Sequence, residues 1–151
     1  MRKSSGVPVL AFLLVATLAF AADAQPPTSP RVVATYFHRT LRCQTCLQIE
    51  ALARYDVTDV MADDVEAGRL AWRSLNFEEE PNAHCEEDYG LEGPSLVIAL
   101  EQDGKVLKWV RLDRVWEIYE DVEALDRYLM GTVREYLAAA AAIAAGEAGA
   151  P

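Results

Sequence analysis

The feature that most constrains this chain is a Cys-x-x-Cys pair, Cys43 and Cys46, placed between an apolar run and a helical pattern. The run 31–37 is nearly all apolar, which is typical of a strand buried on both faces of a parallel sheet. After the cysteines, apolar residues recur at three- and four-residue steps, which predicts a helix from about Cys43 to Glu66. A helix that begins at Cys43 places its sulfur at the positive end of a helix dipole.

Three further apolar runs predict strands, at 70–77, 95–101 and 106–112. The segment 102–105 contains an Asp-Gly pair, which tolerates the positive backbone angles of a tight hairpin turn. Two basic residues interrupt the last run, so we expect that strand at an edge of the sheet.

Two more helices are expected, a short one over 81–89 and a long one near the end of the chain. Asp113 or Asp121 is a candidate cap for the long helix, whose apolar stripe runs to Tyr136. The region 56–59 is expected to break the first helix, which Gly68 ends.

The element order is therefore strand, helix, strand, short helix, hairpin and helix. This order predicts an α/β, thioredoxin-like fold with a central four-stranded mixed sheet flanked by helices. Because Cys43 and Cys46 lie at the first strand-to-helix junction, motif and context together predict redox cysteines more strongly than the motif alone.

The first 24 residues have the pattern of a secretory signal peptide: a basic start, an apolar stretch over 9–20 and a small-x-small site at Ala22–Ala24. An uncleaved membrane anchor is the alternative, although the stretch is short for a bilayer. We expect a linker at 25–30, one domain at 31–137 and an alanine-rich tail at 138–151. The mature protein would be periplasmic or secreted, without stable membrane insertion.

Charge and cysteine content exclude several classes of function. The net charge of −10 becomes −11 without the leader, so a nucleic acid or an anionic membrane surface is not expected as a partner. Three cysteines are too few for a disulfide scaffold, and Cys85 is left over if Cys43 pairs with Cys46.

The expected chemistry is thiol–disulfide exchange with a protein thiol or disulfide as partner. At the helix cap, Cys43 would be the attacking thiolate, and Cys46, one turn further in, would resolve the mixed disulfide. Arg42 and Arg39 precede the pair and would add positive charge. A purely structural disulfide is the alternative.

Four stretches of the chain carry a resemblance to a known family: YFHRTLRCQTC at 36–46, GRLAWR at 68–73, EDYGL at 87–91 and LDRVWE at 112–117. On these the chain resembles the thioredoxin superfamily and, more narrowly, small exported bacterial proteins of the ArsF family, also called nitrophenyl compound nitroreductase subunits. The resemblance implies a thioredoxin-like fold with Cys43 and Cys46 as redox pair. Nitroreduction normally needs a flavin, and the sequence has no phosphate-binding loop for one, so we expect no cofactor.

The chain departs from ordinary thioredoxins around this pair. Gln44 and Thr45 separate the cysteines without a proline, and Arg42 stands where a tryptophan is usual. The resemblance places a cis-proline near Pro94 or Ser95, which would support the active edge. For Pro94, an ordinary strand-initiating proline is the alternative.

Two other functions remain open from the sequence. Cys85 follows the second strand and could reach the same sheet edge as Cys43, so Cys43, Cys46, Cys85 and His84, or His38, could hold a soft metal. A buried, idle Cys85 and a hydrogen-bonded His38 are the alternatives. The chain could also be a non-catalytic subunit of a redox complex. Oxidant, reductant and isomerase are not distinguished.

Overall fold

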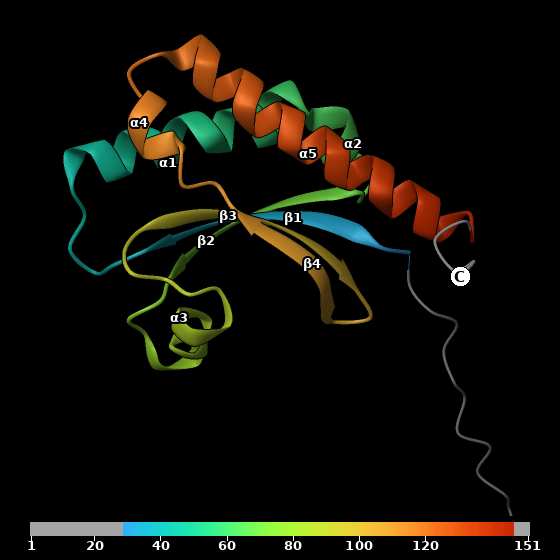
Figure 1. Ribbon diagram of the computed structural model, residues 1–151, viewed down its shortest axis with the longest axis horizontal. Coiled ribbons are helices and arrows are strands. Elements are labelled where there is room, and N and C mark those ends of the chain that lie inside the picture. The colour runs from blue at the N-terminus through green and yellow to red at the C-terminus, as the bar shows by residue number, and fades with distance from the viewer. Residues whose placement is uncertain (1–28, 147–151) are drawn as a thin grey trace, which may run out of the picture.

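The computed structural model describes residues 29–146 of the 151-residue chain (Figure 1). The expected signal peptide, most of the linker and the last five residues lie outside this range. In chain order the elements are β1 (Arg31–His38), α1 (Gln44–Tyr55), η1 (Asp56–Val60), α2 (Ala62–Glu66), β2 (Leu70–Asn76), η2 (Glu80–Asn82), α3 (His84–Asp88), β3 (Ser95–Gln102), β4 (Lys105–Arg111), α4 (Val115–Ile118) and α5 (Val122–Ala144).

The four strands form one mixed sheet in the order β2-β1-β3-β4. β1 runs parallel to β2 and antiparallel to β3, and β4 is antiparallel to β3 at the edge. The β1–α1–β2 unit, the β3–β4 hairpin and the C-terminal helix confirm the expected thioredoxin-like α/β fold. The edge position expected for the last strand is also confirmed.

The helices α1 and α5 cover one face of the sheet (Figure 1). Alternate residues of β1 point to this face, among them the fully buried Tyr36, and they pack against Ile49 of α1 and Leu129 of α5. This packing holds the start of α1 against the carboxyl end of β1, where the two cysteines lie.

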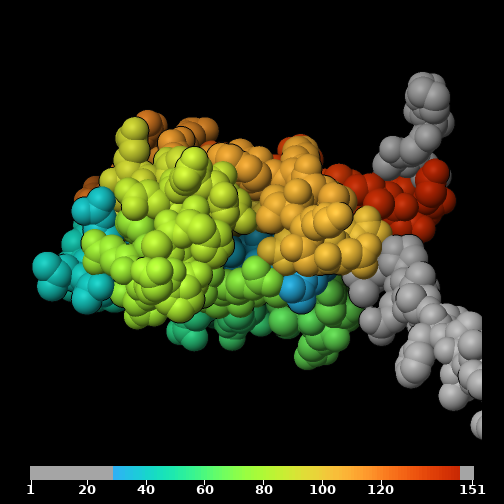
Figure 2. All heavy atoms as spheres, turned by 90° about the horizontal axis from the view of Figure 1, so that it is seen from below, coloured from blue at the N-terminus to red at the C-terminus, as the bar shows by residue number. Residues whose placement is uncertain are grey.

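The opposite face carries a second, smaller core under α3. Its buried residues are Phe37, Phe77, Cys85, Leu91 and Val97. Figure 2, seen from below, shows the yellow-green segment that includes α3 beside the orange β4 hairpin, with β1 visible between them. The two clusters use opposite faces of β1 because successive side chains of a strand alternate.

The predicted break in the first helix is present and takes the form of a π-helical turn, η1. At the other end of the chain, Asp121 caps α5 by accepting a hydrogen bond of 3.0 Å from the amide of Ala124. α5 runs without interruption across residue 138 to Ala144, and Ala140 is part of the main core. The first part of the alanine-rich segment therefore packs with the domain.

Between residues 29 and 146, none of the helices has the length and apolar character needed to cross a membrane.

Candidate redox site

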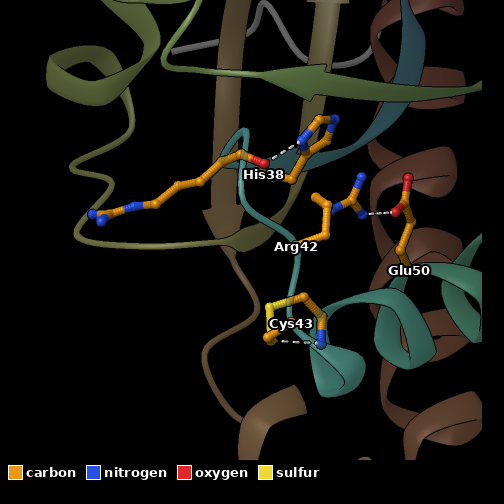
Figure 3. Close-up of a disulfide and its surroundings, with 6 residues drawn as sticks. His38, Arg42, Cys43 and Glu50 are labelled. Carbon is orange, nitrogen blue, oxygen red and sulfur yellow. Dashed lines mark hydrogen bonds and ion pairs between the residues drawn. A yellow bond between two sulfur atoms is a disulfide. The ribbon is translucent and has the colours of Figure 1, made fainter.

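Cys43 and Cys46 form a disulfide at the start of α1, shown in Figure 3. Cys43 is the N-cap residue: its backbone is extended, and its Sγ accepts a hydrogen bond of 3.0 Å from the amide of Cys46. This amide is one of the donors that a helix N-terminus leaves without an intrahelical partner. A thiolate at Cys43 would therefore meet a backbone donor and the positive end of the helix dipole.

The two cysteines differ in exposure to solvent. Cys43 is exposed, whereas Cys46 is buried, with 5% of its surface exposed. Leu41, two residues before Cys43, is 89% exposed, and the first turn of α1 contains no acidic residue. An incoming thiol can thus reach Cys43, and no carboxylate of that turn opposes a thiolate there.

Arg42 does not direct its charge at the sulfurs. Its guanidinium forms an ion pair with Glu50, and Figure 3 shows it directed at that carboxylate. It also lies over the Tyr36 ring, 6.0 Å from the centroid, while Ser74 of β2 donates its hydroxyl hydrogen bond to Glu50. The expected positive charge next to Cys43 is therefore balanced by a carboxylate that we did not single out from the sequence.

Glu50 could have been found from helical spacing. It follows Cys46 by four residues, and such residues are neighbours on one face of a helix. Burial and the charges of Arg42 and Glu50 act on Tyr36: burial, the larger cause, raises the pKa of its hydroxyl above the ordinary range.

The loop between β1 and α1 is held by two contacts with other segments, one to the Glu78 carboxylate and one to the Glu92 backbone. Glu78 accepts a hydrogen bond of 2.9 Å from the Thr40 amide and lies 3.9 Å from Arg39, measured between side-chain oxygen and nitrogen. Arg39 also donates to the backbone oxygen of Glu92 at 3.1 Å. The hydrogen bonds from Thr40 lower the pKa of the Glu78 carboxyl. These contacts of Glu78 fix the loop before the cysteines.

His38 is the last residue of β1, and its ring forms a hydrogen bond within the same β1–α1 loop. Nδ1 lies 3.0 Å from the backbone oxygen of Arg39, and the carbonyl can only accept, so Nδ1 carries the hydrogen of this bond. This is the hydrogen-bonded histidine that we expected as the alternative to a metal ligand.

Pro94 and Ser95 lie next to β1 at this edge, since Ser95 opens β3 opposite Phe37. The chain contains no cis peptide bond between residues 29 and 146, so the cis-proline implied by the resemblance is corrected to a trans bond at Pro94. Pro94 directly precedes β3, where its missing N–H interrupts no ladder. The Ser95 hydroxyl donates to the backbone oxygen of Gly93 at 2.9 Å, and both residues line a surface depression with Trp116.

The proposed soft-metal set is not assembled. Cys85 is a free, buried thiol of the second core, and α1 with its cysteines covers the opposite face of the sheet. Burial, followed by the charge of Asp88, raises the pKa of the Cys85 thiol. No three His, Cys, Asp or Glu side chains of the described part of the chain group as metal ligands. Because β1 and β2 are parallel, both strands end at the same edge of the sheet. After β2, however, the chain packs α3 with Cys85 on the face opposite α1 (Figure 1).

The carboxyl of Asp56 is a buried titratable group that lies away from the cysteines. Asp56, the first residue of η1, is 2% exposed, and its Oδ2 has no hydrogen-bond partner among the described residues. Burial and then the neighbouring carboxyl of Asp126 on α5 raise the pKa of Asp56 to about 7. The whole of α1 separates Asp56 from the disulfide, so this carboxyl is not part of the redox site.

No protein-family model and no curated protein matches the sequence. Among solved structures, the chain is similar to a thioredoxin from Thermus thermophilus at 18% identity, with a TM-score of 0.38 over 63% of this chain and 73% of that one. It is also similar to a structure described as that of a malarial protein, at 15% identity and a TM-score of 0.36 over 63% of this chain and 92% of that one. The strand order and connections described above define the fold as thioredoxin-like.

Proposed function

We propose that this protein is a thiol–disulfide oxidoreductase that acts through Cys43 and Cys46. The observation that supports this most is the exposed Cys43 at the N-cap of α1, whose Sγ accepts a hydrogen bond from the amide of Cys46. A structural disulfide needs neither an exposed cysteine nor a thiolate-stabilising cap. The proposed partner is a protein thiol or disulfide. Thiols and disulfides are the groups with which this pair can exchange.

The exchange balances without a cofactor. A thiolate of a partner dithiol attacks the Sγ of the exposed Cys43, the Cys43–Cys46 bond breaks, and Cys46 leaves as a thiolate that takes up a proton. The second thiolate of the partner then attacks the partner sulfur of the mixed disulfide and releases Cys43. Two electrons have moved to this protein, and the reverse sequence reduces a partner disulfide.

Single cysteine variants test this function through reduction of insulin disulfides by dithiothreitol. Cys43→Ser is expected to remove the protein's acceleration of this reaction, because no attacking thiolate remains. In a separate reaction from which dithiothreitol is removed, the pre-reduced Cys46→Ala variant is expected to accumulate a mixed disulfide with insulin at Cys43, which mass spectrometry identifies. Full acceleration by Cys43→Ser would refute the proposal.

We further propose that the protein acts outside the cytoplasm and is related to the exported proteins of the ArsF family. The support is the leader pattern of residues 1–24 and the four matching stretches, which include the cysteine pair. Expression of the full chain, followed by N-terminal sequencing of the exported form, tests the first part: cleavage after Ala24 is expected. An intact N-terminus in the cytoplasm would contradict it.

A further inference from the structure

The ion pair of Arg42 and Glu50 lies next to the cysteine pair in the chain and links three elements. Arg42 belongs to the loop before Cys43, Glu50 to α1, and Ser74, which donates to Glu50, to β2. The side chains of Arg42 and Glu50 are only 23% and 18% exposed. Part-buried charges are screened less by solvent and salt than surface pairs, so this pair affects its neighbours more strongly.

Both charges lie close to the cysteines along the chain. Arg42 directly precedes Cys43, and Glu50 follows Cys46 by one helical turn, a spacing that places Cβ atoms about 5–6 Å apart. Taken alone, the cation would favour a thiolate at Cys43, and the carboxylate would disfavour it. Together they leave the helix N-terminus as the main source of thiolate stabilisation.

From this arrangement we propose that Glu50 is a positioning residue that lowers the reduction potential of the Cys43–Cys46 couple by holding and neutralising Arg42. The inference rests on the proposed redox function of this pair. Thiolate stabilisation favours the dithiol form over the disulfide, so a balanced Arg42 keeps the disulfide more stable than an unbalanced one would.

Opposite single variants separate this role from mere support of the fold. Glu50→Gln leaves the Arg42 cation without its counter-charge, which stabilises the Cys43 thiolate and destabilises the disulfide. Arg42→Gln leaves the Glu50 carboxylate unbalanced and does the reverse. A variant carrying both changes restores electrical balance. Loss of packing alone would not shift the two single variants in opposite directions.

The measured quantity is the equilibrium constant for thiol–disulfide exchange between glutathione and the protein without its leader, residues 25–151, at about pH 7.5. Protein dithiol and glutathione disulfide give protein disulfide and two glutathione thiols, so atoms and electrons balance. We expect the equilibrium constant to fall about threefold to tenfold in Glu50→Gln and to rise by a similar factor in Arg42→Gln, where tenfold corresponds to about 30 mV. The double variant should lie within about twofold of the wild type.

The control is Glu66→Gln, which removes the same charge at an exposed position at the end of α2. It should leave the equilibrium within about twofold. Equal constants in the wild type and both single variants, or a shift of both in one direction, would overturn the inference. Should Glu50→Gln fail to fold, Arg42→Gln decides, because a constant that does not rise contradicts the proposal.

Failure of the proposed function itself looks different. In that case the wild-type cysteine pair does not equilibrate with glutathione at all, whereas failure of the Glu50 inference leaves wild-type exchange intact. The Cys43 pKa, read from peptide-resolved alkylation against pH, provides a second check. It should fall in Glu50→Gln and rise in Arg42→Gln.

Discussion

The amide of Cys46 donates a hydrogen bond of 3.0 Å to the sulfur of Cys43 across the first turn of α1. The pair combines an exposed cysteine at the helix cap with a buried cysteine inside the turn. This asymmetry assigns different chemistry to two residues of the same type, and it is the basis of the first prediction.

In the reduced protein, Cys43 is expected to react with iodoacetamide at pH 7 at least about tenfold faster than Cys46. The reason is that the thiolate is the reactive form, and the helix N-terminus and the Cys46 amide favour it at Cys43 alone. Peptide mass spectrometry after timed quenching measures both rates in one sample. Faster labelling of Cys46 would contradict the assignment of Cys43 as the attacking group.

Cys85 is expected to take no part in exchange. It is buried on the opposite face of the sheet from α1, and its pKa is raised by burial. Cys85→Ala should keep insulin-reduction activity within about twofold of the wild type, while removing a buried sulfur from the second core lowers stability by about 1 kcal/mol.

The same variant tests the soft-metal hypothesis. We expect calorimetric titration of the reduced protein with zinc to show no binding site that depends on Cys85. A zinc dissociation constant below about 1 μM in the wild type that is lost in Cys85→Ala would instead mean that Cys85 binds the metal together with Cys43 and Cys46.

Asp56 is expected to make the free energy of unfolding depend on pH. Its pKa is raised to about 7 in the folded protein, against about 3.9 in an unfolded chain. The folded state therefore binds the extra proton between these values. The contribution of Asp56 to the free energy of unfolding is fully present below about pH 4 and is lost as pH rises through 7. One such proton gives a slope of at most about 1.4 kcal/mol per pH unit.

Urea unfolding of the oxidised protein at several pH values measures this slope. Asp56→Asn should flatten it, because the amide cannot ionise, whereas Asp63→Asn on the exposed side of α2 should leave it unchanged. An identical slope in the wild type and Asp56→Asn would show that Asp56 titrates normally.

The contact of Glu78 with the Thr40 amide is expected to control the mobility of the loop before the cysteines. Glu78→Ala removes the acceptor, so hydrogen exchange at the Thr40 amide should accelerate several-fold while exchange in β1 stays unchanged. Glu80→Ala, an exposed neighbour in the same acidic run, serves as the control. Unchanged exchange at Thr40 in Glu78→Ala would contradict the role of this contact.

The strands, the broken first helix and the hairpin could be predicted because each depends on a pattern within a few residues. A strand that is buried on both faces is apolar throughout, and a helix repeats its apolar residues every three or four positions. The break at 56–59 was expected in the same way, but its π-helical form and the burial of Asp56 were not.

The strand-helix junction that carries Cys43 and Cys46, and the thioredoxin-like order of elements, follow from the amino-acid sequence alone. The side of the sheet that receives Cys85, the neutralisation of Arg42 by Glu50 and the contact of Glu78 with the Thr40 amide became visible in the folded chain. The difference arises because periodicity is a local property of the chain. Partners across elements depend instead on strand register, side-chain direction and the path of each loop over the sheet.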